Sequence, residues 1–94
     1  MKQNYFVYIL RCSDKSLYTG ITNDVDKRIK AHNAGRAAKY TYARRPVKLL
    51  HTIKLRSKSA ALKREAQIKS LTKAAKEALL IRARTRLRGK KRSC

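Results

Sequence analysis

The chain of 94 residues carries 26 lysines and arginines against five acidic residues, which gives a formal net charge of +21. This length allows one domain with a modest core and excludes a second module, and so large a positive charge favours a polyanion, nucleic acid above all, as the partner. We therefore expect one domain over residues 1–94, with its core at about residues 4–80 and a flexible basic tail at residues 82–94.

The two cysteines, Cys12 and Cys94, fit neither a disulfide framework nor a metal-ligand spacing, so we expect reduced thiols in a cytoplasmic protein. The first apolar run, Tyr5 to Leu10, is too short for a signal peptide or a membrane span. The basic helical segments lack the Trp and Phe anchors of an interfacial helix. We expect no membrane contact and no obligate protein partner, and a monomer whose charge opposes association.

The chain begins with a predicted hairpin of two strands. Residues 5–12 are largely aromatic and aliphatic on both faces, which is typical of a central strand. A turn-like Ser-Asp-Lys-Ser segment leads to a second strand at residues 17–22, so Tyr8 and Tyr18 are expected to face each other across the antiparallel pair. Gly20 removes a side chain from the second strand at a point where another group needs to come close.

A helix is predicted to follow the hairpin. Asn23 is a good N-cap, and the helix is expected to run to about Ala34, where Gly35 ends it. Arg28 and His32 are one turn apart and share a face of this helix. We expect both on the flank of the helix beside the sheet, where a functional side chain would be half-buried.

A basic loop over residues 36–45 leads to a third predicted strand over residues 46–55. Apolar and polar side chains alternate along this strand, which indicates one covered face and one wet face. The residues expected on the covered face are Val47, Leu49, His51, Ile53 and Leu55.

Two more helices are predicted in the second half of the chain. Ser57 or Ser59 can cap a helix over residues 59–71, and Thr72 can cap another over residues 73–87. The order β-β-α-β-α-α predicts an α+β domain in which a small three-stranded antiparallel sheet is flanked by helices.

Glu65 is the one carboxylate between residues 26 and 77, and it lies at the edge of an apolar helix face. It can bind a hard cation, because Mg²⁺ and Mn²⁺ are commonly held by one or two carboxylates together with waters and substrate phosphate. An ion pair on a solvated helix face explains it equally well. The candidates for that ion pair are Lys63, Arg64 and Lys69.

Five positions, taken in order, resemble the motif set of the GIY-YIG nuclease domain. They are Tyr8 in Phe6-Val7-Tyr8, Tyr18 in Tyr18-Thr19-Gly20, Arg28, His32, and Glu65 at the end of Ala61-Leu62-Lys63-Arg64-Glu65. The resemblance covers roughly residues 4–80 and is closest to the small stand-alone GIY-YIG proteins of bacteria. Phe6 replaces the glycine of the first motif, and Thr19 replaces the isoleucine of the second.

This resemblance implies a metal-dependent endonuclease that hydrolyses phosphodiester bonds in DNA, including structured or damaged DNA. It implies one Mg²⁺ or Mn²⁺ on Glu65. Tyr18, or Tyr8 through a hydrogen bond, would position or deprotonate the attacking water, with Arg28 and His32 contacting the phosphate or orienting the tyrosines. A phenol has an ordinary pKa of about 10, and we expect Arg28 and a bound dication to lower it.

The chain departs from the family pattern at Ile21, because some characterised members have a lysine three residues after the second tyrosine. Lys15, Lys27 or Lys39 would have to supply that charge. We also expect no separate DNA-targeting domain of the kind that many relatives carry. An alternative is therefore a catalytically weak or inactive module of the same fold that binds DNA or RNA, and another is a small basic protein bound to RNA or the ribosome.

Binding of nucleic acid is expected to depend on basic residues around the site, without sequence readout. Tyr40 and Tyr42, in the basic loop, either stack on unpaired bases or pack the loop. The basic residues chosen as candidate contacts are Arg36, Lys39, Arg44, Arg45, Lys48 and Lys69.

Overall fold

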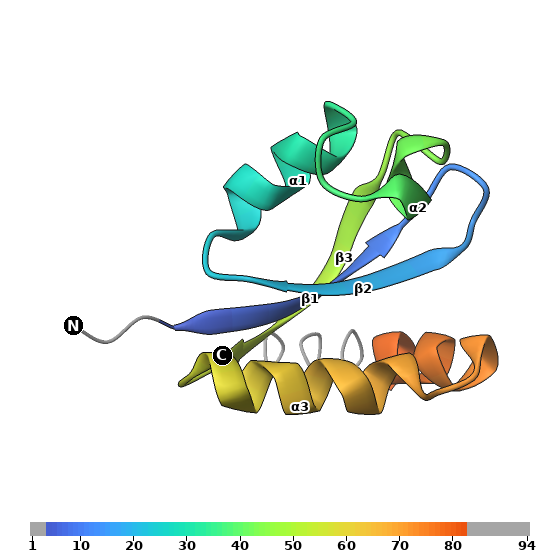
Figure 1. Cartoon of the computed structure of the whole chain (residues 1–94). Coiled ribbons are helices and arrows are strands. Elements are labelled where there is room, and N and C mark those ends of the chain that lie inside the picture. The colour runs from blue at the N-terminus through green and yellow to red at the C-terminus, as the bar shows by residue number, and fades with distance from the viewer. Residues whose placement is uncertain (1–3, 83–94) are drawn as a thin grey trace, which may run out of the picture.

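The computed structural model describes residues 4–82, which form a three-stranded antiparallel sheet between two layers of helix (Figure 1). The elements are β1 (Tyr5–Arg11), β2 (Leu17–Thr22), α1 (Val25–Asn33), α2 (Lys39–Tyr42), β3 (Lys48–Leu55) and α3 (Lys58–Lys69), followed by a helical segment at residues 73–82. The strand order is β2-β1-β3, so the first strand is central, and the predicted α+β class is confirmed.

The two faces of the sheet build two separate cores. In Figure 1, α1 and α2 lie on one face of the sheet, and α3 and the 73–82 segment lie on the other. On the α3 face, Val7 and Ile9 pack against Ala61, Ile68 and Leu80. Full burial of a valine, leucine or isoleucine side chain stabilises the fold by roughly 1.5–3 kcal/mol, and this burial keeps the helices packed on this face of the sheet.

The opposite face carries a smaller core that includes a tyrosine. Tyr8, Leu10, Cys12 and Val47 are buried there, and Ile29 of α1 packs against them. Side chains alternate along β1 as a strand requires, so its two faces are both covered. Tyr8 is thereby directed to the α1 side of the sheet.

Helix α1 begins one residue later than predicted, because Asp24 caps it in place of Asn23. The Asp24 side chain accepts a hydrogen bond from the Lys27 backbone N–H at 3.1 Å. The Thr22 hydroxyl in turn accepts one from the Asp24 backbone N–H at 3.1 Å, which fixes the cap to the end of β2. Gly35 follows the helix with a φ of +81°, as expected for a residue that ends a helix.

The segment predicted as a loop at residues 36–45 contains the single-turn helix α2. Its buried residue is Thr41, whose hydroxyl donates to the Ala38 carbonyl at 3.2 Å. Arg44 ties the end of this segment to the hairpin turn through Asp14 at 3.0 Å. A four-residue helix has too few turns for a hydrophobic period, so the sequence pattern could not reveal it.

Strand β3 contains an irregularity that corrects the predicted alternation. Ile9 pairs with His51, whereas its neighbour Leu10 pairs with Leu49, so Leu50 is an extra residue on β3. The bulge puts the residues before it and those after it on opposite faces, so Val47 packs in the core around Tyr8 whereas Ile53 and Leu55 pack in the core of the α3 face, and the expectation of one shared covered face is wrong. Leu49 was expected on a covered face and is instead 39% exposed, while Leu50 packs partly buried against the core of the α3 face.

Both helices in the second half begin at predicted caps. The Ser57 hydroxyl accepts from the Ala60 backbone N–H at 3.1 Å, and the Thr72 hydroxyl accepts from that of Ala75 at 3.1 Å. Within residues 4–82, no helix is long and apolar enough to cross a membrane. The predicted basic tail lies, from residue 83 on, outside the described residues.

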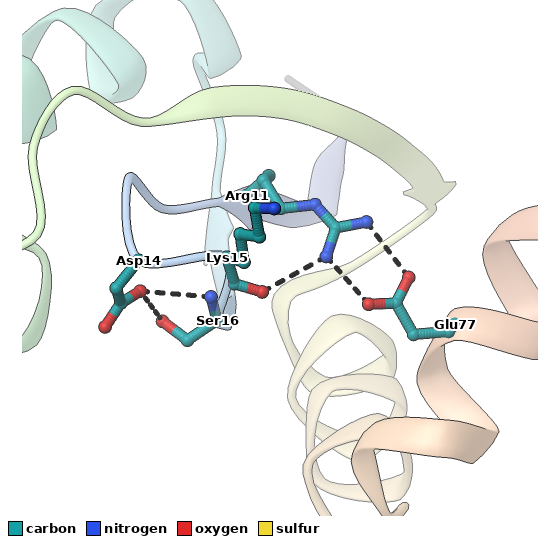
Figure 2. A network of polar contacts seen from close by, with 5 residues as sticks. All are labelled: Arg11, Asp14, Lys15, Ser16 and Glu77. Atoms are coloured by element: carbon teal, nitrogen blue, oxygen red, sulfur yellow. Dashed lines mark hydrogen bonds and ion pairs between the residues drawn. The ribbon is translucent and has the colours of Figure 1, made fainter.

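A bidentate ion pair joins the hairpin to the 73–82 segment (Figure 2). The Arg11 guanidinium donates to both carboxylate oxygens of Glu77, at 2.7 and 3.0 Å, and also to the Lys15 carbonyl at 3.2 Å. Hydrogen bonding to Arg11 holds the pKa of Glu77 below its ordinary value. This contact positions the last described helix on the α3 side of the sheet.

Candidate active site

The side chain of Tyr8 lies directly against Gly20 on the neighbouring strand. The two residues are paired in the β1–β2 register. A Cβ atom at position 20 would lie 2.5 Å from the Tyr8 Oη and 2.6 Å from its Cζ, which no real side chain tolerates. The group that needs Gly20 to be small is therefore Tyr8, whose ring crosses the edge strand β2.

A cavity of about 200 Å³ lies at this crossing, and all five candidate residues line it. The lining consists of Tyr8, Tyr18, Gly20, Ile21, Arg28, His32, Ala37 and Glu65. The five candidates come from the strands β1 and β2 and from the helices α1 and α3, which lie on opposite faces of the sheet (Figure 1). The structure thus brings together residues that are up to 57 positions apart in the chain.

Three rings form a compact cluster in the cavity. Tyr18 pairs with Leu10 in the register, so the two tyrosines are diagonal neighbours on one face of the sheet. The Tyr8 and Tyr18 ring centroids are 6.3 Å apart, and the His32 ring lies edge-on to both, at 5.7 and 5.2 Å. Such edge contacts between aromatic rings are favourable and hold the cluster in place.

A buried hydrogen-bond chain leads from Tyr8 away from the cavity. The Tyr8 hydroxyl lies 2.8 Å from Nε2 of His32, and Nδ1 of His32 lies 2.7 Å from the Thr41 hydroxyl. Because Thr41 already donates to the Ala38 carbonyl, its oxygen accepts from Nδ1–H. Nε2 therefore carries the lone pair, and the Tyr8 hydroxyl donates its proton to it.

Burial controls the protonation of this chain. Burial raises the pKa of Tyr8 well above its ordinary value, Tyr18 and Glu65 add to the rise, and Arg28 opposes it. The lowering was expected from Arg28 and a bound dication, and Arg28 alone does not produce it at Tyr8, since desolvation outweighs the nearby guanidinium. Burial, followed by Arg28, lowers the pKa of His32. At neutral pH Tyr8 is a protonated donor and His32 a neutral acceptor.

Arg28 and His32 share a helix face, but their side chains differ in exposure to solvent more than that shared face predicted. His32 is 1% exposed and bonded at both ring nitrogens, so the expectation of a half-buried histidine on the flank is wrong. Arg28 is exposed. It also lines an adjoining hollow of about 240 Å³ together with Lys27. Arg28 can therefore reach a ligand from solvent, whereas His32 acts only through Tyr8.

Glu65 lines the cavity and also forms one of the ion pairs that its sequence position suggested. It lines the cavity, with 18% of its side chain exposed, and its Oε2 lies 3.2 Å from Nζ of Lys69 one turn along α3. The ion-pair explanation is therefore present in the structure, with Lys69 as partner. The pair is partly solvated, so it does not prevent Glu65 from binding another cation.

The donor set of the cavity suits a metal that keeps its own waters. Within residues 4–82 there is no group of three or more His, Cys, Asp and Glu side chains that could enclose a metal ion. Glu65 is the carboxylate in the cavity lining, and His32 has both nitrogens engaged. One carboxylate fits Mg²⁺ or Mn²⁺ completed by water and phosphate oxygens, and it does not fit a closed zinc site.

Ile21 lines the cavity at the position where a lysine was considered missing. Of the three lysines that might replace that charge, Lys27 lines the adjoining hollow beside Arg28, and Lys15 and Lys39 line neither space. Among the described residues, Arg28 is thus the one cationic side chain in the lining of the cavity.

None of the six predicted nucleic-acid contacts is among the residues that line the cavity, and three of them make contacts within the described part of the chain. Arg44 pairs with Asp14, and Lys69 pairs with Glu65. Arg45 donates to the carbonyls of Tyr42 at 2.8 Å and Asn33 at 3.4 Å. The others are exposed: Arg36, Lys39 and Lys48.

Sequence reasoning missed Thr41, which fixes the orientation of His32. Thr41 lies in a stretch predicted as loop, and a lone threonine there carries no periodic signal. Its hydroxyl nevertheless accepts from Nδ1–H of His32 and so leaves the lone pair on Nε2, the nitrogen that faces Tyr8.

Comparison with known proteins places the chain in a family. The family model described as the GIY-YIG catalytic domain matches residues 4–78. The chain belongs to the GIY-YIG family. Its fold is accordingly that of a nuclease family, as the five spaced motif residues predicted.

Relatives of this GIY-YIG chain are found in bacteria and archaea. UPF0213 proteins of Natronomonas pharaonis and Syntrophus aciditrophicus are 51% and 56% identical to it over 80 and 81 residues. These alignments each cover 85% of this chain, and 94% and 92% of the respective relatives. Their names state no activity.

Two solved structures resemble this GIY-YIG chain. The solution NMR structure of a UPF0213 protein from Bacillus halodurans is 48% identical with a TM-score of 0.55, covering 82% of each chain. The solution NMR structure of a protein from E. faecalis is 37% identical with a TM-score of 0.61, covering 90% of this chain and 93% of that one. Both support the α+β architecture.

Proposed function

We propose that this protein is a metal-dependent endonuclease that hydrolyses phosphodiester bonds in DNA. The observation that carries the proposal is the convergence of Tyr8, Tyr18, Arg28, His32 and Glu65 on one cavity of about 200 Å³. The net charge of +21 supports a polyanionic substrate. Membership of the GIY-YIG family supports a nuclease.

Hydrolysis of a phosphodiester needs positive charge at the non-bridging oxygens and a path for the proton of the attacking water. Arg28 meets the first need, because its guanidinium is exposed at the cavity and can bind two phosphate oxygens at once. Positive charge that is already positioned before the reaction stabilises the transition state most, because the protein does not have to reorganise during the reaction.

Tyr8 and His32 meet the second need. The Tyr8 hydroxyl donates to Nε2 of His32, so its oxygen can accept a hydrogen bond from water in the cavity. As the oxygen of the water bonds to phosphorus, the bond from phosphorus to the leaving oxygen breaks. The proton of the water passes to the Tyr8 oxygen, the Tyr8 proton passes to Nε2, and the leaving oxygen takes a proton from solvent. Tyr18, which contacts both rings, holds this pair and the water in position. The high pKa of Tyr8 is compatible with this route, because no free phenolate has to form first.

Glu65 would hold one Mg²⁺ or Mn²⁺, with waters and phosphate oxygens completing its shell. When bound, the ion supplies positive charge to the phosphate and the leaving oxygen. Lys69 occupies part of the same carboxylate, so the ion and the Lys69 ammonium compete for Glu65.

A second candidate function is binding of nucleic acid without efficient cleavage. The Glu65–Lys69 ion pair favours it, since an already neutralised carboxylate attracts a dication less strongly. Ile21 favours it too, because it brings no charge to the cavity.

The test is cleavage of a panel of supercoiled plasmid, single-stranded DNA, branched duplex and RNA, each with Mg²⁺, with Mn²⁺ and with EDTA. The wild type is compared with Glu65→Gln, which keeps the size of the side chain and removes its charge. We expect metal-dependent nicking of DNA that Glu65→Gln reduces by about a thousandfold, the equivalent of several kcal/mol of transition-state stabilisation.

Binding is followed in the same samples, with Lys63→Ala as a control for loss of one charge from the same helix. Equal binding by the wild type and Glu65→Gln, with no cleavage by either under any metal, would reject the nuclease proposal. The protein would then be a module that binds nucleic acid without cutting it. Preferred cleavage of RNA would reject the assignment to DNA.

A further inference from the structure

Helix α2 presents two tyrosine rings to solvent, each accompanied by an arginine. Tyr40 is 38% exposed, and the guanidinium of Arg44 lies 4.0 Å from the centre of its ring. Tyr42 is 57% exposed, and the guanidinium of Arg45 lies 4.5 Å from the centre of its ring. The Tyr42 ring also lies close to Gly35, where an added Cβ would be 2.9 Å from its Cδ1, so each ring packs locally over part of its surface and leaves the rest to solvent.

This pair of rings adjoins the candidate active site. The Tyr40 ring stacks on that of Tyr18, with centroids 5.9 Å apart and planes inclined by 27°. Tyr18 lines the cavity that contains Arg28 and Glu65. A nucleic-acid strand whose phosphate lies in the cavity therefore has Tyr40 beside its next nucleotides.

Backbone and charged groups hold the two arginines in place. Arg44 donates to the Tyr40 carbonyl at 2.8 Å and to Asp14 at 3.0 Å. Arg45 donates to the Tyr42 carbonyl at 2.8 Å. The guanidinium planes of Arg44 and Arg45 are thus ordered before any ligand arrives, so little conformational entropy is lost on binding.

We propose that α2 is a stacking platform for unpaired nucleobases, made of Tyr40 with Arg44 and Tyr42 with Arg45. Every base has a π-face that can stack on a tyrosine ring or a guanidinium plane, whereas the bases of a duplex are already stacked and paired. The platform therefore selects DNA with a single-stranded segment next to the scissile phosphate. This inference rests on the proposed function for the position of that phosphate.

Positive charge beside the platform suits the backbone of the same strand. Arg36 and Lys39 are exposed immediately before or at the start of α2. Lysine and arginine contacts to phosphates give affinity without sequence preference, and stacking gives the preference for unpaired bases. Sequence-independent binding of single strands follows from the two together.

The test measures fluorescence anisotropy of the intact protein with a labelled oligothymidylate of about a dozen nucleotides and with a duplex of equal length. EDTA is present, so no cleavage interferes. We expect Tyr40→Ala and Tyr42→Ala each to weaken binding of the oligothymidylate about tenfold and to change duplex binding less than about twofold. Tyr40→Phe and Tyr42→Phe keep the ring and should restore the wild-type affinity.

Two controls separate stacking from charge and from damage to the fold. Ile81→Ala removes an exposed apolar side chain on the 73–82 segment and should change neither affinity. The slope of log K against log salt should be the same in the alanine variants and the wild type, because stacking neutralises no phosphate. Circular dichroism checks that each variant is folded.

Equal losses on both ligands, or no loss on the oligothymidylate, would overturn the platform. Tighter binding of an oligouridylate than of the oligothymidylate would overturn its assignment to DNA. These outcomes do not depend on catalysis. If the wild type cuts no DNA but the alanine variants lose affinity for the single strand, the platform stands and the nuclease proposal fails. If the wild type cuts DNA and the alanine variants keep that affinity, the nuclease proposal stands and the platform fails.

Discussion

The Tyr8 hydroxyl donates to Nε2 of His32 across 2.8 Å, and this buried contact is oriented by a third residue, Thr41, on the far side of the imidazole. A tyrosine that is hard to ionise is thereby joined to a neutral base that is shielded from water. The arrangement makes the protonation of Tyr8 depend on His32 beside it and on Thr41, which is not among the residues that line the cavity.

Thr41→Val tests this dependence. Valine has nearly the same shape but leaves Nδ1–H of His32 buried without an acceptor, which lowers the free energy of unfolding by about 1–3 kcal/mol. Because the tautomer is no longer held, we expect the maximal rate of plasmid nicking to fall at least about tenfold. Thr41→Ser keeps the hydroxyl and should retain the rate.

NMR titration of His32 distinguishes orientation from simple loss of packing. The pKa and the ring-nitrogen shifts of His32 should change in Thr41→Val and stay as they are in Thr41→Ser. Unchanged His32 signals in Thr41→Val, together with a normal rate, would show that Thr41 has no part in the site.

Stability should decrease on mild acidification because of two histidines. Burial lowers the pKa of both His32 and His51 in the folded protein. As the pH falls below about 6.5, the unfolded chain takes up protons that the folded chain refuses, so stability is complete above this pH and is lost as the pH falls toward the folded pKa.

The measurement for this prediction is the urea midpoint of unfolding between about pH 7.5 and 5.5. His51→Gln should flatten part of the decrease and leave the part due to His32. A wild-type midpoint that is level over this range would contradict the prediction. Protonation of His32 also removes the acceptor for Tyr8, so nicking should decline in the same direction.

Gly20→Ala should inactivate the site without changing any polar residue. The new methyl group would lie 2.5 Å from the Tyr8 Oη, so the ring must move and its hydroxyl must leave His32. Misplacement of a reacting group by about 1 Å costs roughly a hundredfold in rate, and overpacking lowers stability by about 1–3 kcal/mol.

The comparison for that variant is Gly35→Ala, which strains a backbone with φ of +81° and crowds Tyr42 and Arg45 but does not change a residue that lines the cavity. Maximal rates at saturating DNA are compared, so that differences in affinity do not contribute. If both glycine variants lost the same fraction of the rate, general destabilisation would explain the result and the close contact with Tyr8 would not.

Lys69→Ala should tighten binding of a divalent metal. The Lys69 ammonium lies 3.2 Å from the Glu65 carboxylate and competes with a dication for it. The pair is partly exposed and worth up to about 1 kcal/mol, so its removal should lower the Mn²⁺ concentration for half-maximal nicking by up to about fivefold. Lys63→Ala, on the same helix, should leave that concentration unchanged. A higher concentration in Lys69→Ala would mean that Lys69 helps the metal or the substrate to bind.

The spacing of the motif residues predicted the family and the strands that carry the tyrosines, because a strand alternates and a helix repeats in ways that sequence displays directly. It could not reveal the bulge at Leu50, which arises from how β3 pairs with β1. The role of Thr41 was hidden as well, since it depends on a one-turn helix that is held by distant contacts. Nor could the helix periodicity show that Glu65 would reach a cavity beside α1 from the opposite layer.

Helix α3 rests on the sheet through two buried side chains, Ala61 and Ile68, and yet it carries Glu65. A molecule in which α3 has opened locally keeps the hydrogen bonds from Tyr8 through His32 to Thr41 and loses the carboxylate of the cavity. Local openings of this kind require less free energy than global unfolding. We therefore expect heating to abolish the proposed nuclease activity, through loss of the docking of α3, at a lower temperature than the one that unfolds the sheet.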